Sequence, residues 1–279
     1  MTQAWTLSGF GDEIDPDPVM QVAVLKALGA SHIEVRSAWG VNVVDLEDHQ
    51  LARLAQLFAT AGMGVSAVAS PIGKVDIAAP VDHEVERLGR VIRVAQSLGT
   101  ESIRVFSFFR GAGIAVESIR DDVLVRMRAL ADLAEREHVV LLHENEKGIY
   151  GDIPERVLDL VESVGSPAVR LAWDSANFVQ VGVTRPFDEG YAKLRPYLDY
   201  LQVKDAVAAT GEVVAAGMGD GQLPETLRAL RDDGYGGFAS LEPHLAAGHE
   251  LGGFSGPEAF GQAARAFRAI TDDLEVELL

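Results

Sequence analysis

The sequence predicts a (β/α)8 barrel, and the order of its apolar segments is the main reason. Short runs rich in Val, Ile and Leu alternate with longer segments of helical periodicity, which is typical of βαβ units and a parallel sheet. Eight such evenly spaced units favour closure into a barrel, and 279 residues is close to the usual length of one barrel. The eight runs are Leu7–Gly11, Ile33–Ser37, Val65–Ala69, Ile103–Ser107, Val139–Glu144, Val169–Asp174, Tyr200–Lys204 and Phe238–Glu242.

Helix boundaries support the count of eight units. Asp15 before Pro16 predicts an N-cap with proline at the first helical position. Glycines predict the C-terminal caps of four helices, at Gly29, Gly62, Gly99 and Gly234. A doubly wound sheet would share these features. It is disfavoured because the first strand is not followed by a G-x-G-x-x-G turn: Gly9-Phe10-Gly11 continues into Asp12-Glu13.

Composition limits the classes of function. The chain is 48% hydrophobic and shows no linker, which predicts one domain over residues 1–279. Its 42 acidic and 24 basic residues give a net charge of −18, which disfavours binding of nucleic acid or anionic membranes. It contains no cysteine, no apolar run of membrane-spanning length and no signal-like N-terminus, so we expect a cytoplasmic protein. Homo-oligomer formation is left open.

Polar residues occupy the inward-facing positions of several predicted strands. Ile33 and Val35 are the outward pair of their strand, which leaves Glu34 and Arg36 facing the barrel interior. The same alternation places further polar side chains inside and close to the C-terminal strand ends, where active sites of this fold lie. These are Arg104, Glu144, Asp174, Gln202, Lys204 and Glu242. Buried carboxylates need a counter-charge, and a divalent metal is the simplest one, although any single residue could instead form a structural ion pair.

Five short motifs then identify a resemblance. They are Gly9-Phe10-Gly11-Asp12-Glu13, His143-Glu144-Asn145-Glu146, Trp173-Asp174-Ser175-Ala176-Asn177, Gln202-Val203-Lys204-Asp205 and Ser240-Leu241-Glu242-Pro243-His244. In this order and at this spacing they resemble the sugar phosphate isomerase/epimerase family of xylose isomerase-like TIM barrels. The resemblance covers nearly the whole chain and does not identify a substrate.

The resemblance implies one divalent metal held by the ends of the last four strands. Carried over to this chain, the ligands are Glu144, Asp174, Gln202 and Glu242. Gln202 stands where the family usually has histidine, and Asn177 stands where its sugar epimerases often have histidine. An amide oxygen at 202 makes all the ligands oxygen, which favours Mn²⁺ or Mg²⁺ over Zn²⁺, or else abolishes tight metal binding.

The family's chemistry implies a metal-dependent isomerase or epimerase of carbohydrate metabolism, acting on a sugar, sugar phosphate or polyol. Glu144 and Glu242 would transfer a proton through a metal-stabilised enediolate, and Lys204 would neutralise oxyanion charge. A keto-polyol dehydratase would use the same site, and a non-catalytic ligand-binding barrel stays open because of Gln202 and Asn177. The endonuclease branch of the superfamily is disfavoured by the net charge and by only seven scattered histidines.

Residues around the strand ends are candidates for substrate binding. We assign Glu34, Arg104, Trp39, Asn177 and His244 to this role, with Trp39 as an apolar wall of the pocket. Arg36, Arg104 and Arg110 could receive a substrate phosphate or pair with neighbouring acids, which leaves phosphorylation of the substrate undecided. His143 has the wrong strand parity for a metal ligand.

Overall fold

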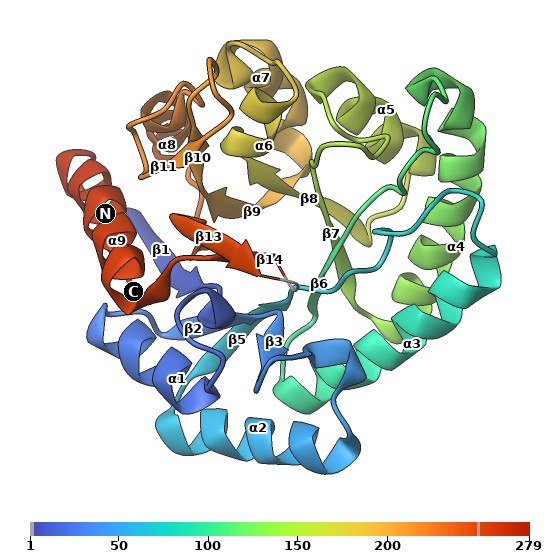
Figure 1. Ribbon diagram of the computed structural model, residues 1–279. Coiled ribbons are helices and arrows are strands. Elements are labelled where there is room, and N and C mark those ends of the chain that lie inside the picture. Colours follow the sequence, from blue (N-terminus) through green and yellow to red (C-terminus); the bar gives the residue numbers. More distant parts are fainter. Residues whose placement is uncertain (1–2, 250–251) are drawn as a thin grey trace.

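The computed structural model describes residues 3–249 and 252–279, and its centre is a curled parallel sheet (Figure 1). The strands of this sheet are β1 (Gln3–Gly9), β2 (His32–Val35), β5 (Gly64–Val68), β6 (Ser102–Val105), β7 (Val140–Glu144), β8 (Val169–Asp174), β9 (Leu198–Val203), β12 (Phe238–Leu241) and β15 (Val276–Leu278). They lie in the order β15-β1-β12-β9-β8-β7-β6-β5-β2, and neighbouring strands are parallel. The eight predicted runs thus correspond to eight of these strands.

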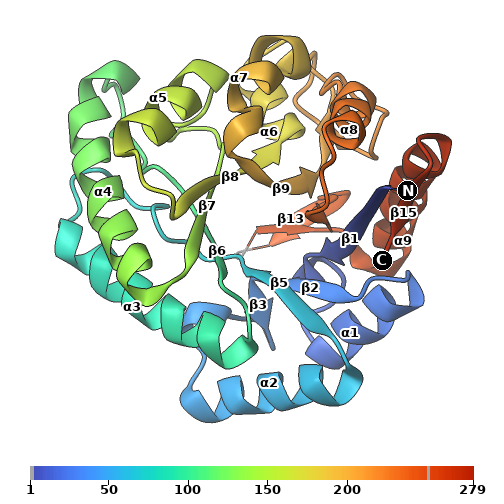
Figure 2. The same ribbon diagram turned by 180° about the vertical axis from the view of Figure 1, so that it is seen from behind.

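The sheet closes on itself between its first two strands in sequence. A parallel bridge joins Phe10, just after β1, to Glu34 of β2. The helices surround the closed sheet as a ring, seen from both sides in Figures 1 and 2. They are α1 (Pro18–Ala27), α2 (Asp48–Ala61), α3 (Val81–Leu98), α4 (Arg120–Glu137), α5 (Pro154–Val164), α6 (Ser175–Gln180), α7 (Ala192–Leu194), α8 (Leu223–Asp232) and α9 (Gly256–Asp273). The predicted (β/α)8 barrel is confirmed. Strand β15, which pairs with residues 3–5 of β1, was not predicted.

Two of the four predicted C-terminal caps are confirmed, the glycines Gly29 and Gly234 each follow the cap residue by one position, and the predicted N-cap is wrong. Helices α2 and α3 end at Gly62 and Gly99, whose positive φ of 62° and 75° is the left-handed conformation that glycine adopts without strain. Helix α1, in contrast, is capped by Asp17, which accepts from the backbone N–H of Val19. The carboxylate of Asp15 instead accepts from the N–H of Asp17, so the helix starts two residues later than predicted.

Buried apolar side chains form a large core and two small clusters, one of which consists of Ala176, Val179 and Ala206. The larger core fills the space between the sheet and the surrounding helices and includes Trp5, Leu241 and Phe260. A small cluster of inward-facing residues packs inside the barrel, and it consists of Ala67, Leu142, Ala172 and Tyr200. The polar residues described below occupy the space above it.

Three short hairpins extend from the loops at the C-terminal strand ends. They are β3 (Ser37–Ala38) with β4 (Val41–Asn42), β10 (Asp205–Ala206) with β11 (Val213–Val214), and β13 (Ala246–His249) with β14 (Gly252–Phe254). The last hairpin crosses the centre of the barrel mouth in Figure 1. Arg36 donates to the backbone oxygen of Gly253 at 2.9 Å and thereby ties this hairpin to β2. Among the described residues, no helix is long and apolar enough to cross a membrane.

Candidate active site

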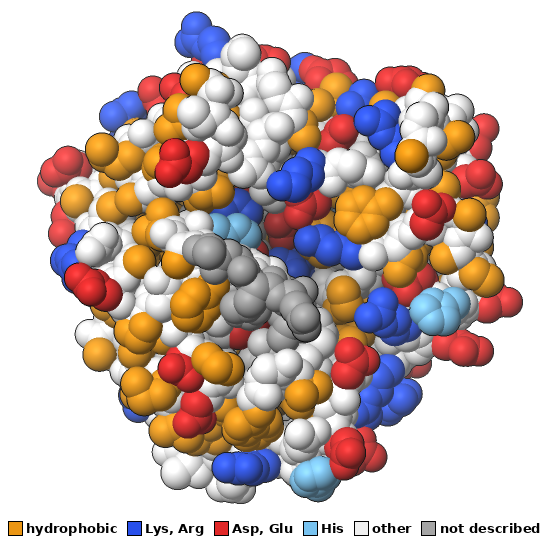
Figure 3. All heavy atoms as spheres, in the orientation of Figure 1, with side chains coloured by type: hydrophobic (Ala, Val, Ile, Leu, Met, Phe, Trp, Pro, Cys, Tyr) orange, Lys and Arg blue, Asp and Glu red, His pale blue; other side chains and the backbone are white. Residues whose placement is uncertain are grey.

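Charged side chains gather in a hollow at the barrel mouth. Figure 3 shows acidic, basic and histidine side chains together near the centre of this face. The sequence-predicted residues Glu144 and Asp174 end β7 and β8, Gln202 lies on β9, and Glu242 directly follows β12. Each of these four side chains is at most 3% exposed. Alternation along the strands therefore brings the four predicted ligands to one place.

Three carboxylates and two cations form the centre of the site. Glu144, Asp174 and Glu242 each offer an oxygen, and these oxygens lie within 4.8 Å of one another. The Lys204 Nζ lies 2.6 Å from Asp174 Oδ2 and 3.0 Å from Glu242 Oε2. An Arg104 guanidinium nitrogen lies 3.1 Å from Glu144 Oε2 and 3.6 Å from Glu242 Oε1. Arg104 thus pairs with the site's own acids, and its predicted role in substrate binding is untested.

Gln202, on the strand next to that of Asp174, has an unpaired side-chain oxygen. Its Nε2 donates to both carboxylate oxygens of Glu34, at 3.1 and 3.2 Å, whereas its Oε1 is buried and has no hydrogen-bond partner in the described structure. In the sheet register, Gln202 is paired with Asp174 on β8. Three carboxylates with one neutral amide oxygen form a donor set suited to a hard divalent cation. The residues at this point therefore fit a metal ion.

Two asparagines hold the carboxylates in place. Asn145 donates to the backbone oxygen of Asp174 at 2.8 Å and accepts from its N–H at 3.0 Å. Asn177 donates to Glu144 Oε1 at 3.1 Å, and its own N–H donates to Asp174 Oδ1 at 2.9 Å. Asn177, predicted to bind substrate, lies within hydrogen-bonding distance of two of the predicted ligands. Its direct role in binding substrate is untested.

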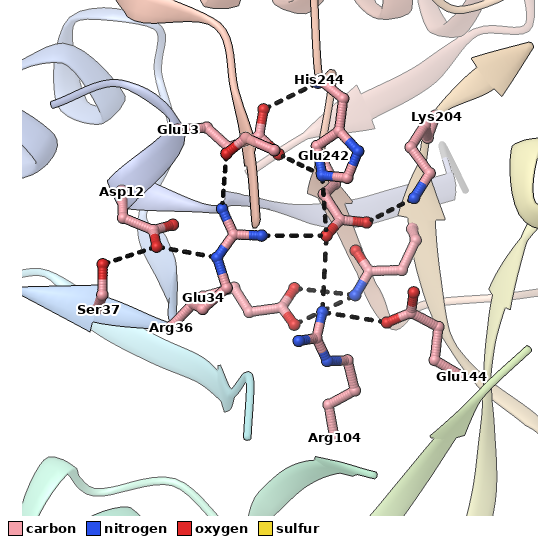
Figure 4. Close-up of polar contacts among 12 residues, drawn as sticks. Asp12, Glu13, Glu34, Arg36, Ser37, Arg104, Glu144, Lys204, Glu242 and His244 are labelled. Atoms are coloured by element: carbon pink, nitrogen blue, oxygen red, sulfur yellow. Dashed lines mark hydrogen bonds and ion pairs between the residues drawn. The ribbon is translucent and has the colours of Figure 1, made fainter. Parts of the chain in front are cut away.

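A second group of charges adjoins the first at Glu242 (Figure 4). Arg36 pairs with Asp12 at 2.9 Å and lies 3.6 Å from Glu242 Oε1. The His244 Nε2 lies 3.0 Å from Glu13 Oε1 and 3.4 Å from Glu242 Oε1. His244 has a positive φ of 46°, a conformation that is costly for a residue other than glycine. Hydrogen bonds from its backbone N–H and from the Ser255 hydroxyl to Glu13 hold it there.

Burial and charge shift the pKa values of the acids in opposite directions. Burial raises the pKa of Glu144 to about 8 and that of Asp174 to about 6, against the opposing charges of Arg104 and Lys204 respectively. Burial alone would also raise the pKa of Glu242, but Lys204, His244 and Arg104 together lower it well below its ordinary value. Glu242 is therefore the carboxylate whose ionised form the site stabilises most.

The same buried charges shift the pKa values of Lys204 and His244. Burial opposes the charged form of Lys204, yet Asp174 and Glu242 raise its pKa well above the ordinary value. In the same way Glu242 and Glu13 outweigh burial and raise the pKa of His244 to about 9. Both side chains are thus held as cations at neutral pH.

Two of the residues named from the sequence lie apart from this centre. Trp39 is half-buried, and its ring packs under the Arg53 guanidinium of α2 at 4.9 Å. In the described part of the chain, no hydrogen bond or ion pair joins Trp39 to the carboxylates. His143 faces away from the barrel interior, as its parity predicted, with Nε2 2.9 Å from Ser107 Oγ.

Sequence reasoning assigned no role to several residues of the site. Tyr200 donates its hydroxyl to Glu34 at 2.9 Å, and the same hydroxyl oxygen lies 2.8 Å from Ser66 Oγ, from which it can accept. Its position two residues before Gln202 on the same strand gives it the inward parity, which would have identified it. Asp12 and Glu13 follow β1 in a quoted motif, but their partners come from distant loops, and nothing in the sequence indicates those pairings.

Comparison with known proteins agrees with this architecture. A relative, 2-epi-5-epi-valiolone 7-phosphate 2-epimerase of Actinoplanes sp., is 35% identical over 145 residues, which are 52% of this chain and 51% of the relative. The match thus spans about half the length of that relative. The relative is named as an epimerase, and the match does not show that the two proteins share a substrate.

Solved structures of the same fold cover almost the whole chain. A D-tagatose 3-epimerase-like protein has a TM-score of 0.77 at 16% identity, covering 96% of this chain and 98% of its own. A xylose isomerase-like TIM barrel protein of Mycobacterium smegmatis in complex with magnesium has a TM-score of 0.70 at 20% identity, covering 98% and 97%. The IOLI protein with a bound zinc atom has a TM-score of 0.74 at 18% identity, covering 97% and 98%. At such identities these likenesses show the fold.

The family itself is shown by a match at the level of sequence. The model of the xylose isomerase-like TIM barrel family matches residues 22–270, which is most of the chain. Its agreement with the closed sheet, the ring of helices and the quoted motifs leads to one conclusion: this chain belongs to the xylose isomerase-like TIM barrel family.

Proposed function

We propose that this chain is a divalent-metal-dependent isomerase or epimerase of a sugar, sugar phosphate or polyol. The observation that carries the proposal is the convergence of three buried carboxylates with the unpaired amide oxygen of Gln202. A cation held by Glu144, Asp174, Gln202 and Glu242 would supply Lewis-acid polarisation of neighbouring substrate oxygens. Mn²⁺ or Mg²⁺ is favoured over Zn²⁺ because all four donors are oxygens.

The acid/base work is assigned to Glu144 and Glu242. Their strands, β7 and β12, lie on either side of β8 and β9 in the sheet, so the two carboxylates flank Asp174 and Gln202. This placement allows one carboxylate to take a proton from the carbon next to a carbonyl group and the other to return it on the opposite face. Lys204, as a buried cation between Asp174 and Glu242, would stabilise negative charge that develops on the substrate oxygen.

The epimerase relative supports this class of reaction, because its name describes a change of configuration at one carbon of a cyclic polyol phosphate. A small-molecule carbohydrate is accordingly the proposed substrate. The cytoplasmic location, homo-oligomer formation and the absence of nucleic-acid or membrane partners stay predictions. So do the keto-polyol dehydratase and the non-catalytic ligand-binding barrel.

The test uses ketoses and polyhydroxylated cyclohexanones, with and without a phosphate, incubated with the Mn²⁺-loaded protein in D₂O. Epimerisation with solvent deuterium at the carbon next to the carbonyl is expected by proton NMR. A product lighter by one water identifies the dehydratase. Thermal stabilisation by one of these compounds without any conversion would favour the ligand-binding barrel, and configuration changed without deuterium uptake would contradict the proton-transfer mechanism.

A further inference from the structure

The side chain of Gln202 is held in one orientation by a carboxylate beneath it. Both Gln202 and Glu34 are completely buried. The amide nitrogen of Gln202 donates to both carboxylate oxygens of Glu34. Because the amide oxygen and nitrogen sit on the same carbon, this pairing directs the oxygen away from Glu34. With both Glu34 oxygens accepting from the amide nitrogen, at 3.1 and 3.2 Å, the amide oxygen is the end of the side chain left without a hydrogen-bond partner in the described structure.

Glu34 is itself fixed by a chain of hydrogen bonds through the barrel. Tyr200 donates to Glu34 Oε2 at 2.9 Å, Ser66 Oγ lies 2.8 Å from the Tyr200 hydroxyl, and Ser8 Oγ lies 2.7 Å from Ser66 Oγ. These residues come from β1, β2, β5 and β9, which are parts of the rigid sheet. Tyr200 thus fixes the Glu34 carboxylate directly, and Ser66 and Ser8 fix the Tyr200 hydroxyl, so the carboxylate is a well-placed acceptor for the side chain above it.

We propose that Glu34 is a positioning residue that keeps the oxygen of the Gln202 amide aimed at the cation site. The proposal rests on the metal site of the proposed function and assigns Glu34 to orienting a ligand rather than to binding substrate. An imidazole at position 202 would donate its ring N–H to the same carboxylate, as metal-bound histidines commonly do to a neighbouring carboxylate. The Gln202 amide N–H donates to Glu34 in the same way, and the amide offers an oxygen to the cation where imidazole would offer a nitrogen. The replacement of histidine by glutamine thus keeps the support from Glu34 and changes only the donor atom.

The substitution Glu34→Gln tests this role. The new amide can donate as well as accept, so it no longer dictates which end of Gln202 faces the site. We expect the Mn²⁺ dissociation constant, measured by calorimetry, to rise about 10- to 100-fold, as for loss of other groups that support a metal ligand. A matched control is Glu84→Gln, which neutralises another buried glutamate whose carboxylate accepts from the Gly73 N–H outside the site. This variant is expected to keep the wild-type constant.

A double-mutant cycle separates positioning from a general loss of structure. In a Gln202→Met background, Glu34→Gln should change the Mn²⁺ dissociation constant by less than about threefold, because the amide to be oriented is gone. Equal losses in both backgrounds would overturn the proposal. If Glu34→Gln does not fold, Tyr200→Phe takes its place in the cycle, since it removes one support of Glu34 and keeps the carboxylate.

The outcomes for the two proposals differ. If the wild type and Glu34→Gln bind Mn²⁺ with the same dissociation constant, the positioning role is overturned and the proposed function is not. If the wild type binds no divalent cation, the proposed function and the positioning role are both overturned. Weaker binding in Glu34→Gln with coupling to Gln202 confirms both the site and the role of Glu34.

Discussion

Lys204 and Asp174 form the shortest ion pair at the centre of the barrel mouth, with Nζ 2.6 Å from Oδ2 and both side chains at most 3% exposed. The same ammonium also contacts Glu242 at 3.0 Å. One lysine therefore neutralises two of the carboxylates that we assign to the metal. The Lys204 ammonium and a bound divalent cation would neutralise the same two carboxylates. The stabilisation that one of them gives therefore depends on whether the other is present.

Lys204→Met should show this dependence. Without added metal we expect the free energy of unfolding to decrease by about 3–5 kcal/mol, because two buried carboxylates lose their partner. Added Mn²⁺ should then raise the melting temperature of the variant by more than it raises that of the wild type. Melting curves with and without Mn²⁺ measure both effects. Equal stabilisation of the two proteins by Mn²⁺ would contradict a cation bound next to Lys204.

Glu144→Gln and Glu242→Gln should both abolish turnover but differ in stability. Burial raises the pKa of Glu144 to about 8, which favours its protonated form. Glutamine resembles that neutral form, so the free energy of unfolding should change by about 1 kcal/mol or less. Glu242 is ionised, and the substitution takes one of their acidic partners from Lys204, Arg104, Arg36 and His244, so we expect a loss of about 3–5 kcal/mol. Denaturant unfolding at pH 7 without metal distinguishes the two, and equal losses would refute the assignment of charge.

A glycine-rich loop after β11 gives a steric prediction. The carboxylate of Asp205 accepts from the N–H groups of Gly217, Gly219 and Gly221, which draws this loop tightly around it. A Cβ added to Gly219 would lie 2.5 Å from the Ala206 backbone oxygen, so Gly219→Ala should destabilise the protein by about 1–3 kcal/mol. The control is Gly89→Ala, at a position in α3 where a Cβ meets nothing within 4 Å.

The control variant, Gly89→Ala, is itself expected to change the free energy of unfolding, in the opposite direction. Alanine is favoured over glycine inside a helix, so Gly89→Ala should stabilise the protein by about 0.5–1 kcal/mol. Chemical denaturation of both variants measures the two effects. Similar stabilities for Gly219→Ala and Gly89→Ala would mean that the loop is not packed against Asp205 as described.

The buried imidazole of His143 leads to a prediction of how the free energy of unfolding depends on pH. Burial lowers its pKa to about 3, from an ordinary value of about 6.5, so the folded chain keeps the imidazole neutral where the unfolded chain protonates it. The stabilising contribution is complete above about pH 6.5 and is lost as the pH falls toward 3, by at most about 1.4 kcal/mol per pH unit. Unfolding free energies measured across this range should fall less steeply for His143→Gln. His49→Gln, at a side chain 74% exposed, serves as the control and should keep the wild-type slope.

Strand periodicity accounts for the parts of this structure that the sequence could predict. Inward parity followed from the regular alternation of Ile33 and Val35 with Glu34 and Arg36, because a strand that packs against helices on one face must bury that face. The same argument brought Asp174 and Gln202 to one mouth, and the register pairs them. The fold, and the convergence of these residues at the barrel mouth, were therefore predictable from the sequence.

Side-chain pairings within the site were not accessible in the same way. Strand periodicity predicts that the Gln202 side chain points into the barrel. It does not predict that the amide nitrogen donates to Glu34 and leaves the amide oxygen unpaired, because that pairing depends on Tyr200 and on the neighbouring strands. The start of α1 was misplaced because Asp15-Pro16 and Asp17-Pro18 are equivalent signals, and only the competing turn at Asp15 selects the second. Contacts such as Glu13 with His244 join segments far apart in the sequence.

The account's central claim is an oxygen-donor metal site that includes Gln202, and calorimetric titration tests it most directly. Wild-type protein and Gln202→His are each titrated with Mg²⁺, Mn²⁺ and Zn²⁺. We expect the wild type to bind Mn²⁺ or Mg²⁺, and the histidine variant to gain affinity for Zn²⁺ more than for Mg²⁺, because imidazole suits Zn²⁺ better. No binding of a divalent cation by the wild type, or an unchanged metal preference after Gln202→His, would contradict the claim.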